Sequence, residues 1–230
     1  MPWNLLILPL IGGYFILSRS NKYKFKQQRL DRQRLIFDSI FAAIILLLGT
    51  VLLRLIINYC LPEFIPIAKE LIPIKTAYIG TAFSAFFAAI IFTYGGNRTL
   101  YKNIKIEVGA AIDEVGNELE LLLKSSATDS KLLEFTLDND KVYIAWVKEL
   151  PIPTISNSTR VIPVLSGYRN EEKRIVFTTH YLSVYAEYVE EGKIKDINEL
   201  DVDLIISLSK VSHVSYFDVD MYERFNPEES

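Results

Sequence analysis

Two histidines, His180 and His213, are the side chains best suited by type to acid–base or metal chemistry in this chain. Each lies in a stretch with the alternating pattern of a strand. Neither has a cysteine, a second histidine or a carboxylate at the spacing that metal sites use. Histidines in such positions are most simply structural, so we predict no metal site and no catalytic base.

Other catalytic motifs are incomplete. The stretch Ser166-Gly167-Tyr168 lacks the flanking glycine of a nucleophile elbow, and no glycine-rich phosphate loop is present. One run of carboxylates is most simply a solvated face: Glu187, Glu190, Glu191, Asp201 and Asp203. A second run near the C-terminus, Asp218, Asp220 and Glu223, lacks the spacing of an EF-hand. The sequence therefore predicts a protein that is not an enzyme and that binds no cofactor.

Aromatic and arginine side chains in or beside predicted strands are better candidates for function. Such residues dominate the energetics of protein interfaces, and small β domains bind peptides in aromatic grooves or at a strand edge. Trp146, Tyr168 and Arg169 are the candidate partner-binding residues. The alternative is that the aromatics fill the core of their own domain, which is the simpler interpretation for Trp146.

Three apolar stretches in the first hundred residues predict how such a domain is held in place: 3–18, 35–59 and 76–94. The third contains no charge, and as a helix it would be about 28 Å long, close to the ~30 Å hydrocarbon core of a bilayer. The first is short and contains Pro9, Gly12 and Gly13, so an interfacial or re-entrant segment is the alternative to a span. Arg54, near the end of the second, is expected to reach lipid head groups.

The segment between the first two stretches determines the predicted orientation. It carries seven basic residues against one acid: Arg19, Lys22, Lys24, Lys26, Arg29, Arg32 and Arg34. Short basic loops remain in the cytoplasm. We therefore expect a multi-pass protein of the inner (cytoplasmic) membrane, with its N-terminus outside and its C-terminal domain in the cytoplasm. The same residues are candidates for contact with membrane lipids, although a topology signal alone explains them.

The third stretch also has small residues at regular spacing. Gly80, Ser84 and Ala88 recur every fourth residue, and a second such row contains Thr81 and Ala85. Small residues at this spacing allow membrane helices to approach closely. We expect the first row to pack against another helix of the chain or against a second copy, which predicts a homo-oligomer.

Charge and cysteine content exclude two further classes. Residues 1–100 carry eleven Lys or Arg and four Asp or Glu, whereas residues 127–230 carry eleven and nineteen. An acidic soluble half is a poor match for nucleic acid, so we expect no direct nucleic-acid binding. The single cysteine, Cys60, excludes an internal disulfide.

The remainder of the chain divides into a helix, a β domain and a tail. Apolar residues at three- and four-residue spacing predict an amphipathic cytoplasmic helix over 98–126, continuous with the third span as one rod from Thr76 to Leu123. Alternation then predicts strands at 131–137, 141–150, 160–168, 174–181 and 203–217, with a partly helical connection before the last. The β domain covers 127–217, and residues 218–230 form an acidic tail.

The strand order resembles a small β-barrel of the SH3-like or Sm-like kind. The residues that carry the resemblance are the second strand, Lys141 to Val147, and the segment from Leu208 to Val214. The resemblance implies a closed, five-stranded barrel. The predicted fold class is thus a membrane α-helical domain with three transmembrane helices, a long amphipathic connecting helix and a mainly-β cytoplasmic domain.

Two functions follow from this layout. The first is an oligomeric membrane-anchored scaffold or sensor whose small barrel recruits a soluble protein partner, as in bacterial anti-phage systems that pair a membrane subunit with an effector. The second is a small ion channel or membrane-permeabilising effector, because three spans followed by an Sm-like domain are similar to the small-conductance mechanosensitive channels. The charged helix at 98–126 departs from that channel pattern.

Overall fold

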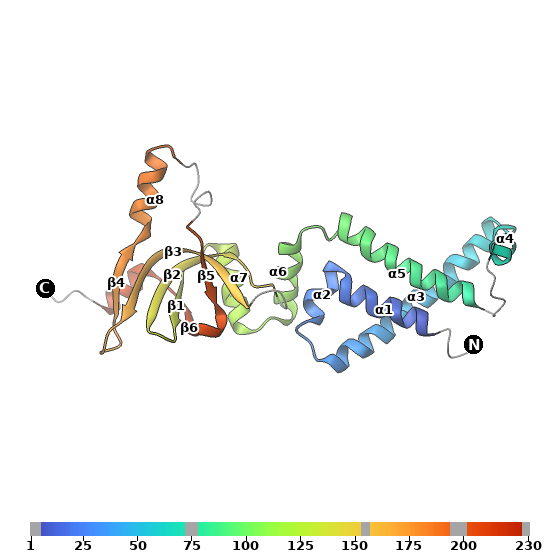
Figure 1. The fold of residues 1–230 in the computed structure, drawn as a ribbon, viewed down its shortest axis with the longest axis horizontal. Coiled ribbons are helices and arrows are strands. Elements are labelled where there is room, and N and C mark those ends of the chain that lie inside the picture. The colour runs from blue at the N-terminus through green and yellow to red at the C-terminus, as the bar shows by residue number, and fades with distance from the viewer. Residues whose placement is uncertain (1–5, 72–77, 153–156, 194–201, 227–230) are drawn as a thin grey trace. The chain divides into compact units, whose positions relative to one another are not determined.

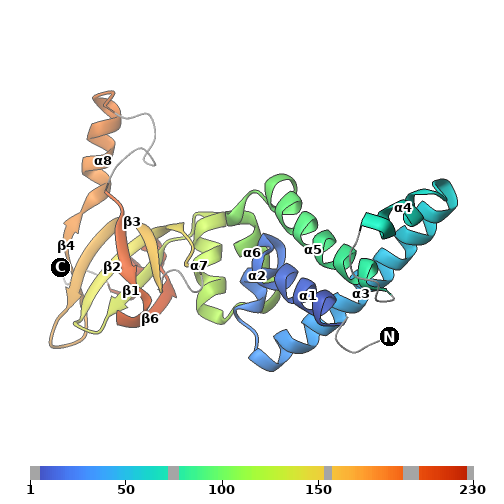
Figure 2. The ribbon, with the colours of Figure 1, turned by 45° about the vertical axis from the view of Figure 1, so that its right-hand side comes forward.

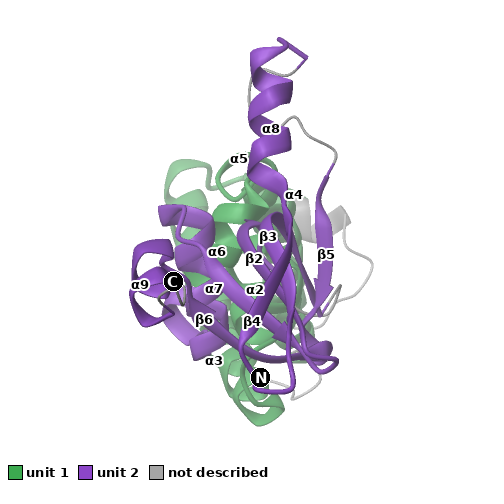
Figure 3. Ribbon diagram, turned by 90° about the vertical axis from the view of Figure 1, so that its left-hand side faces the viewer, with its two compact units in different colours: residues 1–111 green, residues 112–230 purple. Residues whose placement is uncertain are grey.

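The computed structural model describes residues 6–71, 78–152, 157–193 and 202–226 of the chain. The starts of the predicted first and third spans, at Trp3 and Thr76, lie outside these ranges, as does Asp201. The chain forms two compact units, residues 1–111 and 112–230 (Figure 3). The first is helical, and the second contains an antiparallel sheet. Each is described separately below.

The helical unit contains two helices that are long and apolar enough to cross a membrane, α3 and α5. Its α1 is apolar but has only 13 residues, which is shorter than the predicted span. A further helix, α4, lies between the second and third predicted spans. The bounds are α1 (Ile7–Arg19), α2 (Asn21–Gln27), α3 (Arg32–Cys60), α4 (Phe64–Leu71) and α5 (Ile79–Thr99) (Figure 1).

Glycine allows α1 to pack closely against both long helices. A Cβ atom on Gly13 would lie 2.3 Å from the carbonyl oxygen of Ser39 in α3, and one on Gly12 would lie 3.2 Å from Cβ of Ala89 in α5. The buried residues of α5 are likewise small: Thr81, Ala82, Ala85, Ala89 and Thr93. The helices therefore contact each other through backbone and small side chains, as membrane helices do.

The predicted rod from Thr76 to Leu123 is not continuous where the structure describes it. It consists of α5, α6 (Ile104–Val115) and α7 (Glu118–Asp129), with breaks at 100–103 and 116–117. Asn117 starts α7 with a capping box, because its side chain accepts from the Glu120 amide at 2.9 Å and the Glu120 carboxylate accepts from the Asn117 amide at 3.2 Å. This start signal is stronger than the apolar periodicity that suggested one helix.

The sheet has six strands in the described residues, where five were predicted. They are β1 (Leu133–Leu137), β2 (Lys141–Glu149), β3 (Ser158–Arg169), β4 (Ile175–His180), β5 (Leu204–Ser207) and β6 (Val211–Tyr216). The order is β4-β3-β2-β1-β6, and β5 pairs with the first part of β3. Because β4 and β6 do not pair with each other, the sheet is not closed into a barrel.

The extra strand comes from the predicted strand at 203–217. A short 3-10 helix, Leu208–Lys210, divides it, so that β5 pairs with β3 while β6 pairs with β1. The first four strands match their predicted positions within a few residues. The alternating pattern thus located the strands, but it did not show that one segment changes its pairing partner.

Each face of the sheet buries its own set of apolar residues. One face packs on Leu123 of α7 and includes Leu133, Phe135 and Ala145. The opposite face carries Val142, Ile144 and Phe217. On that second face, Tyr222 of α9 (Val219–Phe225) packs against Phe177 of β4 and Phe217, with ring centroids 5.4 Å apart in both pairs. This small helix links the two edge strands that do not pair.

Helix α8 (Tyr181–Glu190) follows β4 and projects from the sheet in two views of the molecule (Figures 1 and 2). Of its ten residues, all described, Tyr185 is the buried one. The Tyr185 hydroxyl donates to the carbonyl of Pro163 in β3 at 3.1 Å. Burial, then the nearby Tyr181 and Asp203, raise the pKa of Tyr185 to about 12. This contact fixes the base of α8 on the sheet.

Candidate functional site

The three predicted partner-binding residues do not form one patch. Trp146 is partly buried against Ile162 and Tyr185, and its indole Nε1 donates to the carbonyl of Ser130 at 3.0 Å. Tyr168 is 46% exposed near the end of β3. Arg169, its neighbour, makes its contacts with residues of β1 and β6, because successive side chains in a strand point to opposite faces. Trp146 is thus a packing residue, Tyr168 is a surface residue, and Arg169 belongs to a polar cluster.

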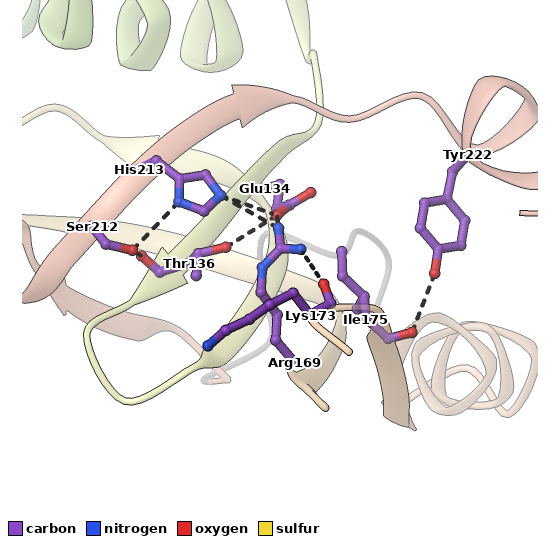
Figure 4. Close-up of polar contacts among 8 residues, drawn as sticks. All are labelled: Glu134, Thr136, Arg169, Lys173, Ile175, Ser212, His213 and Tyr222. Atoms are coloured by element: carbon purple, nitrogen blue, oxygen red, sulfur yellow. Dashed lines mark hydrogen bonds and ion pairs between the residues drawn. The ribbon is translucent and has the colours of Figure 1, made fainter. Parts of the chain in front are cut away.

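That polar cluster joins three strands around the carboxylate of Glu134 (Figure 4). Arg169 Nη2 in β3 donates to Glu134 Oε1 in β1 at 2.5 Å, and Thr136 Oγ1 donates to the same oxygen at 3.0 Å. His213 Nε2 in β6 lies 3.7 Å from Glu134 Oε1 and 3.3 Å from Arg169 Nη2. Since β2 lies between β1 and β3 in the sheet order, the ion pair between Arg169 and Glu134 reaches across β2.

The hydrogen bonds of Ser212 show how this hydroxyl is used. Ser212 Oγ donates to the carbonyl of Thr136 at 3.0 Å and lies 3.4 Å from His213 Nδ1. Ser212, His213 and Glu134 are the residue types of a hydrolytic triad. The Ser212 hydroxyl, however, donates to the backbone carbonyl of Thr136 and not to a base.

One donor of the cluster is left over. The Arg169 guanidinium also donates from Nη1 to the carbonyl of Lys173 at 2.9 Å, while its Nε is buried without a hydrogen-bond partner among the described residues. The side chains of the cluster are otherwise satisfied by one another, which is the arrangement of a structural ion pair.

The remaining candidates for chemistry lie apart. His180 ends β4 and is exposed. Among the described residues, no contact joins it to the cluster around Glu134. No group of three or more His, Cys, Asp or Glu side chains that could hold a metal ion occurs in the described part of the chain. Cys60 is exposed at the end of α3.

Glu134 and His213 were not selected as a site from the sequence, and no local signal selects them. In β1, Leu133, Phe135 and Leu137 alternate with Glu134 and Thr136, which is the pattern of a strand with one solvated face. That second face is instead covered, and Glu134 is 8% exposed. Its partner Arg169 lies 35 residues away in the chain, so the pairing depends on tertiary structure.

Helix α8 carries one of the exposed apolar surfaces of the sheet unit. Its side chains Leu182, Val184, Tyr188 and Val189 are each 40–48% exposed, and Val219, Met221 and Phe225 of α9 form another such surface. The opposite side of α8 carries Ser183, Glu187 and Glu190. An exposed apolar surface is a common mark of an interaction site, so α8 is a candidate binding surface.

In the helical unit, the small residues that pack within the chain belong to the second of the two rows. Thr81, Ala85 and Ala89 are buried, whereas Ser84 is exposed and Gly80 and Ala88 are partly exposed. The role of the first row in helix packing or in an oligomer stays a prediction. Arg54 Nη1 donates to Thr81 Oγ1 in α5 at 2.9 Å, so this arginine binds a neighbouring helix where we had expected it to reach lipid.

The basic residues between α1 and α3 are part of a folded element. Asn97 of α5 accepts from the Asn21 amide at 2.7 Å and donates to the carbonyl of Arg19 at 3.0 Å. The Asn21 side chain donates to the carbonyl of Tyr101 at 2.8 Å. These three bonds hold the start of α2 against the end of α5. The predicted basic loop is thus a short helix with a defined position in its unit.

Comparisons of the chain with models of protein families, with curated proteins and with solved structures find no match. The function that the chain supports must accordingly be argued from its own geometry.

Proposed function

We propose that this protein is a membrane-anchored, oligomeric scaffold or sensor whose sheet unit recruits a soluble protein partner through α8. The apolar face of α8 carries the proposal. In this proposal α1, α3 and α5 all span the inner membrane, the N-terminus is outside and the sheet unit is in the cytoplasm. An anti-phage system is one setting for such a protein.

Support for the membrane placement comes from the distribution of side chains on α3. Its buried residues are Ser39, Ala43 and Thr50, which are small. Large apolar side chains point outward along its whole length: Ile36, Phe37, Ile40, Phe41, Ile44, Ile45, Leu48, Val51, Leu52, Leu53, Leu55 and Ile56. Water would not tolerate so large an apolar surface, whereas lipid does. A core helix of a soluble protein would be mostly buried, and 11% of the most apolar window of α3 is buried.

Support for partner recruitment comes from the contrast between the two sides of α8. Leu182, Tyr185 and Val189 lie at three- and four-residue spacing on one side, and β3 covers that side at Tyr185. The large apolar side chains of α8 at Leu182, Val184, Tyr188 and Val189 are exposed. A partner with an apolar groove would match the apolar side of α8, and basic residues at the rim of that groove would match the glutamates on the opposite side of the helix.

The test is purification of the full chain from its native host in mild detergent, followed by native mass measurement. We expect a stoichiometric soluble protein with the wild-type chain. Val189→Glu should abolish its recovery, because the change places a charge in the apolar stripe. Ser183→Glu, on the polar side of the same helix, is the matched control and should retain the partner.

Other outcomes would contradict the proposal. Equal recovery of the partner with Val189→Glu would show that α8 is not the binding surface. A homo-oligomer without partner that conducts ions in liposomes would instead support the channel function, with Gly80, Ser84 and Ala88 around the pore. Gly80→Leu would then abolish conductance while leaving the oligomer intact.

A further inference from the structure

We propose that α2 and the end of α5 form a binding site for the phosphate head group of an anionic membrane lipid. The inference goes beyond partner recruitment and uses from the proposed function the membrane placement alone. The site consists of Lys22 and Lys26 on one side of α2, together with Tyr23 and Tyr101.

The first argument is that α2 concentrates positive charge. The helix has seven residues, three of which are lysines and none of which is acidic. Lys22 and Lys26 are four residues apart and therefore lie on the same side, where like charges repel. A helix of this composition gains from a nearby anion.

The second argument is that the chain holds this charged helix in place. Phe25 is 2% exposed and Asn21 is buried, so one side of α2 packs into its unit. Asn97 and Tyr101 bind the start of the helix through three hydrogen bonds. A topology signal requires positive charge in a loop and does not require such a structure. The fixed geometry therefore points to a ligand that contacts the lysines in one arrangement.

The third argument is the combination of aromatic and cationic groups. Lys22 Nζ lies 5.3 Å from the ring centroid of Tyr23 and 5.5 Å from that of Tyr101. Lys24 Nζ lies 4.6 Å from the ring of Phe25 on the other side of the helix. Tyrosine and lysine together are typical of the head-group level of a membrane, where the ring is partly in hydrocarbon and the ammonium meets phosphate. The ligand chemistry is thus a lipid phosphate.

The experiment uses the full chain in mild detergent, titrated with phosphatidylglycerol or phosphatidylcholine and observed by native mass spectrometry. We expect preference for phosphatidylglycerol. The double variant Lys22→Gln/Lys26→Gln should weaken its binding about tenfold. Arg32→Gln/Arg34→Gln removes the same charge from the start of α3 and should change the affinity less than about twofold. Lys22→Arg/Lys26→Arg should retain binding, which guards against loss of folding in the glutamine variant.

A further variant separates geometry from charge. Asn97→Ala keeps every lysine but removes two of the three bonds to the α1–α2 junction, and it should reduce the preference for phosphatidylglycerol. Equal weakening in both glutamine double variants, or none, would overturn the site. Full competition by inorganic phosphate would show that the ligand is an anion from solution. Release of the wild-type chain from membranes by alkaline carbonate would contradict the membrane placement itself, whereas retention without lipid preference would contradict this inference alone.

Discussion

The two long apolar helices and the sheet bury different kinds of side chain. In α3 and α5 the buried residues are alanine, serine and threonine, while large apolar residues face outward. In the sheet, Leu133, Phe135 and Ile144 are fully buried. The contrast is the one expected under the proposed membrane placement: in lipid the packing of small residues holds helices together, whereas in water burial of large apolar residues holds a fold together.

The largest expected effect tests the water-adapted interior. Phe135→Ala should lower the free energy of unfolding of the sheet unit by about 4 kcal/mol, because it leaves a cavity in the core under α7. Denaturant unfolding of the full chain in detergent, followed by Trp146 fluorescence with Trp3 changed to Phe, measures it. The matched control is Phe87→Ala in α5, where the ring is 55% exposed. If Phe135→Ala and Phe87→Ala lower the free energy of unfolding of their own units by the same amount, the contrast between the units is wrong.

The second prediction concerns the outward face of α3. Leu48→Asp should cost about 3 kcal/mol of membrane insertion, because a carboxylate at this depth loses its hydration. Ile205→Asp makes a similar change at a 63% exposed position of β5 and should be tolerated. Membrane fractionation of the expressed variants provides the measurement. Normal yield of the Leu48 variant in the soluble fraction would show that α3 faces water.

Close packing in the helical unit gives the third prediction. Gly13→Ala should destabilise that unit by about 2 kcal/mol, because the new methyl group would overlap the Ser39 carbonyl oxygen. Gly49→Ala in α3 has no neighbouring atom within 4 Å of the new Cβ among the described residues and should be neutral or slightly stabilising. Thermal unfolding in detergent compares the two. Identical melting of both variants would mean that α1 does not pack on α3 as described.

The smallest effect belongs to the base of α8. Tyr185→Phe removes one hydrogen bond and should cost the sheet unit about 1 kcal/mol near neutral pH. Folding favours the neutral phenol, since the pKa of Tyr185 is about 12 when folded and 10.0 ordinarily. The stabilisation of the folded state by the neutral Tyr185 phenol is therefore complete below about pH 10 and is lost as the pH rises through about 12. The phenylalanine variant should lack this component of the pH dependence of unfolding, and an unchanged slope would contradict it.

Much of the helical unit follows from the amino-acid sequence. Apolar length located α3 and α5. In the sheet unit, alternation located β1 to β4, because a strand with one buried face leaves a period-two pattern in the chain. The breaks after α5 and α6 were missed, although the Asn117 and Glu120 cap is a local signal for the second of them. The sequence alone also did not distinguish which of two rows of small residues on α5 packs against α1, because both rows have the same spacing.

Tertiary structure decided what periodicity does not encode. Glu134 has the spacing of a solvated residue, yet Arg169 and His213 reach it from strands that are distant in the chain. The segment 203–217 has the pattern of one strand, yet it divides between two partners. Asn97 lies just beyond the third apolar stretch, where no pattern marks it, yet it holds the start of α2 in place. In each case the deciding contact joins residues far apart in the chain, and its energy depends on a geometry that exists only after folding.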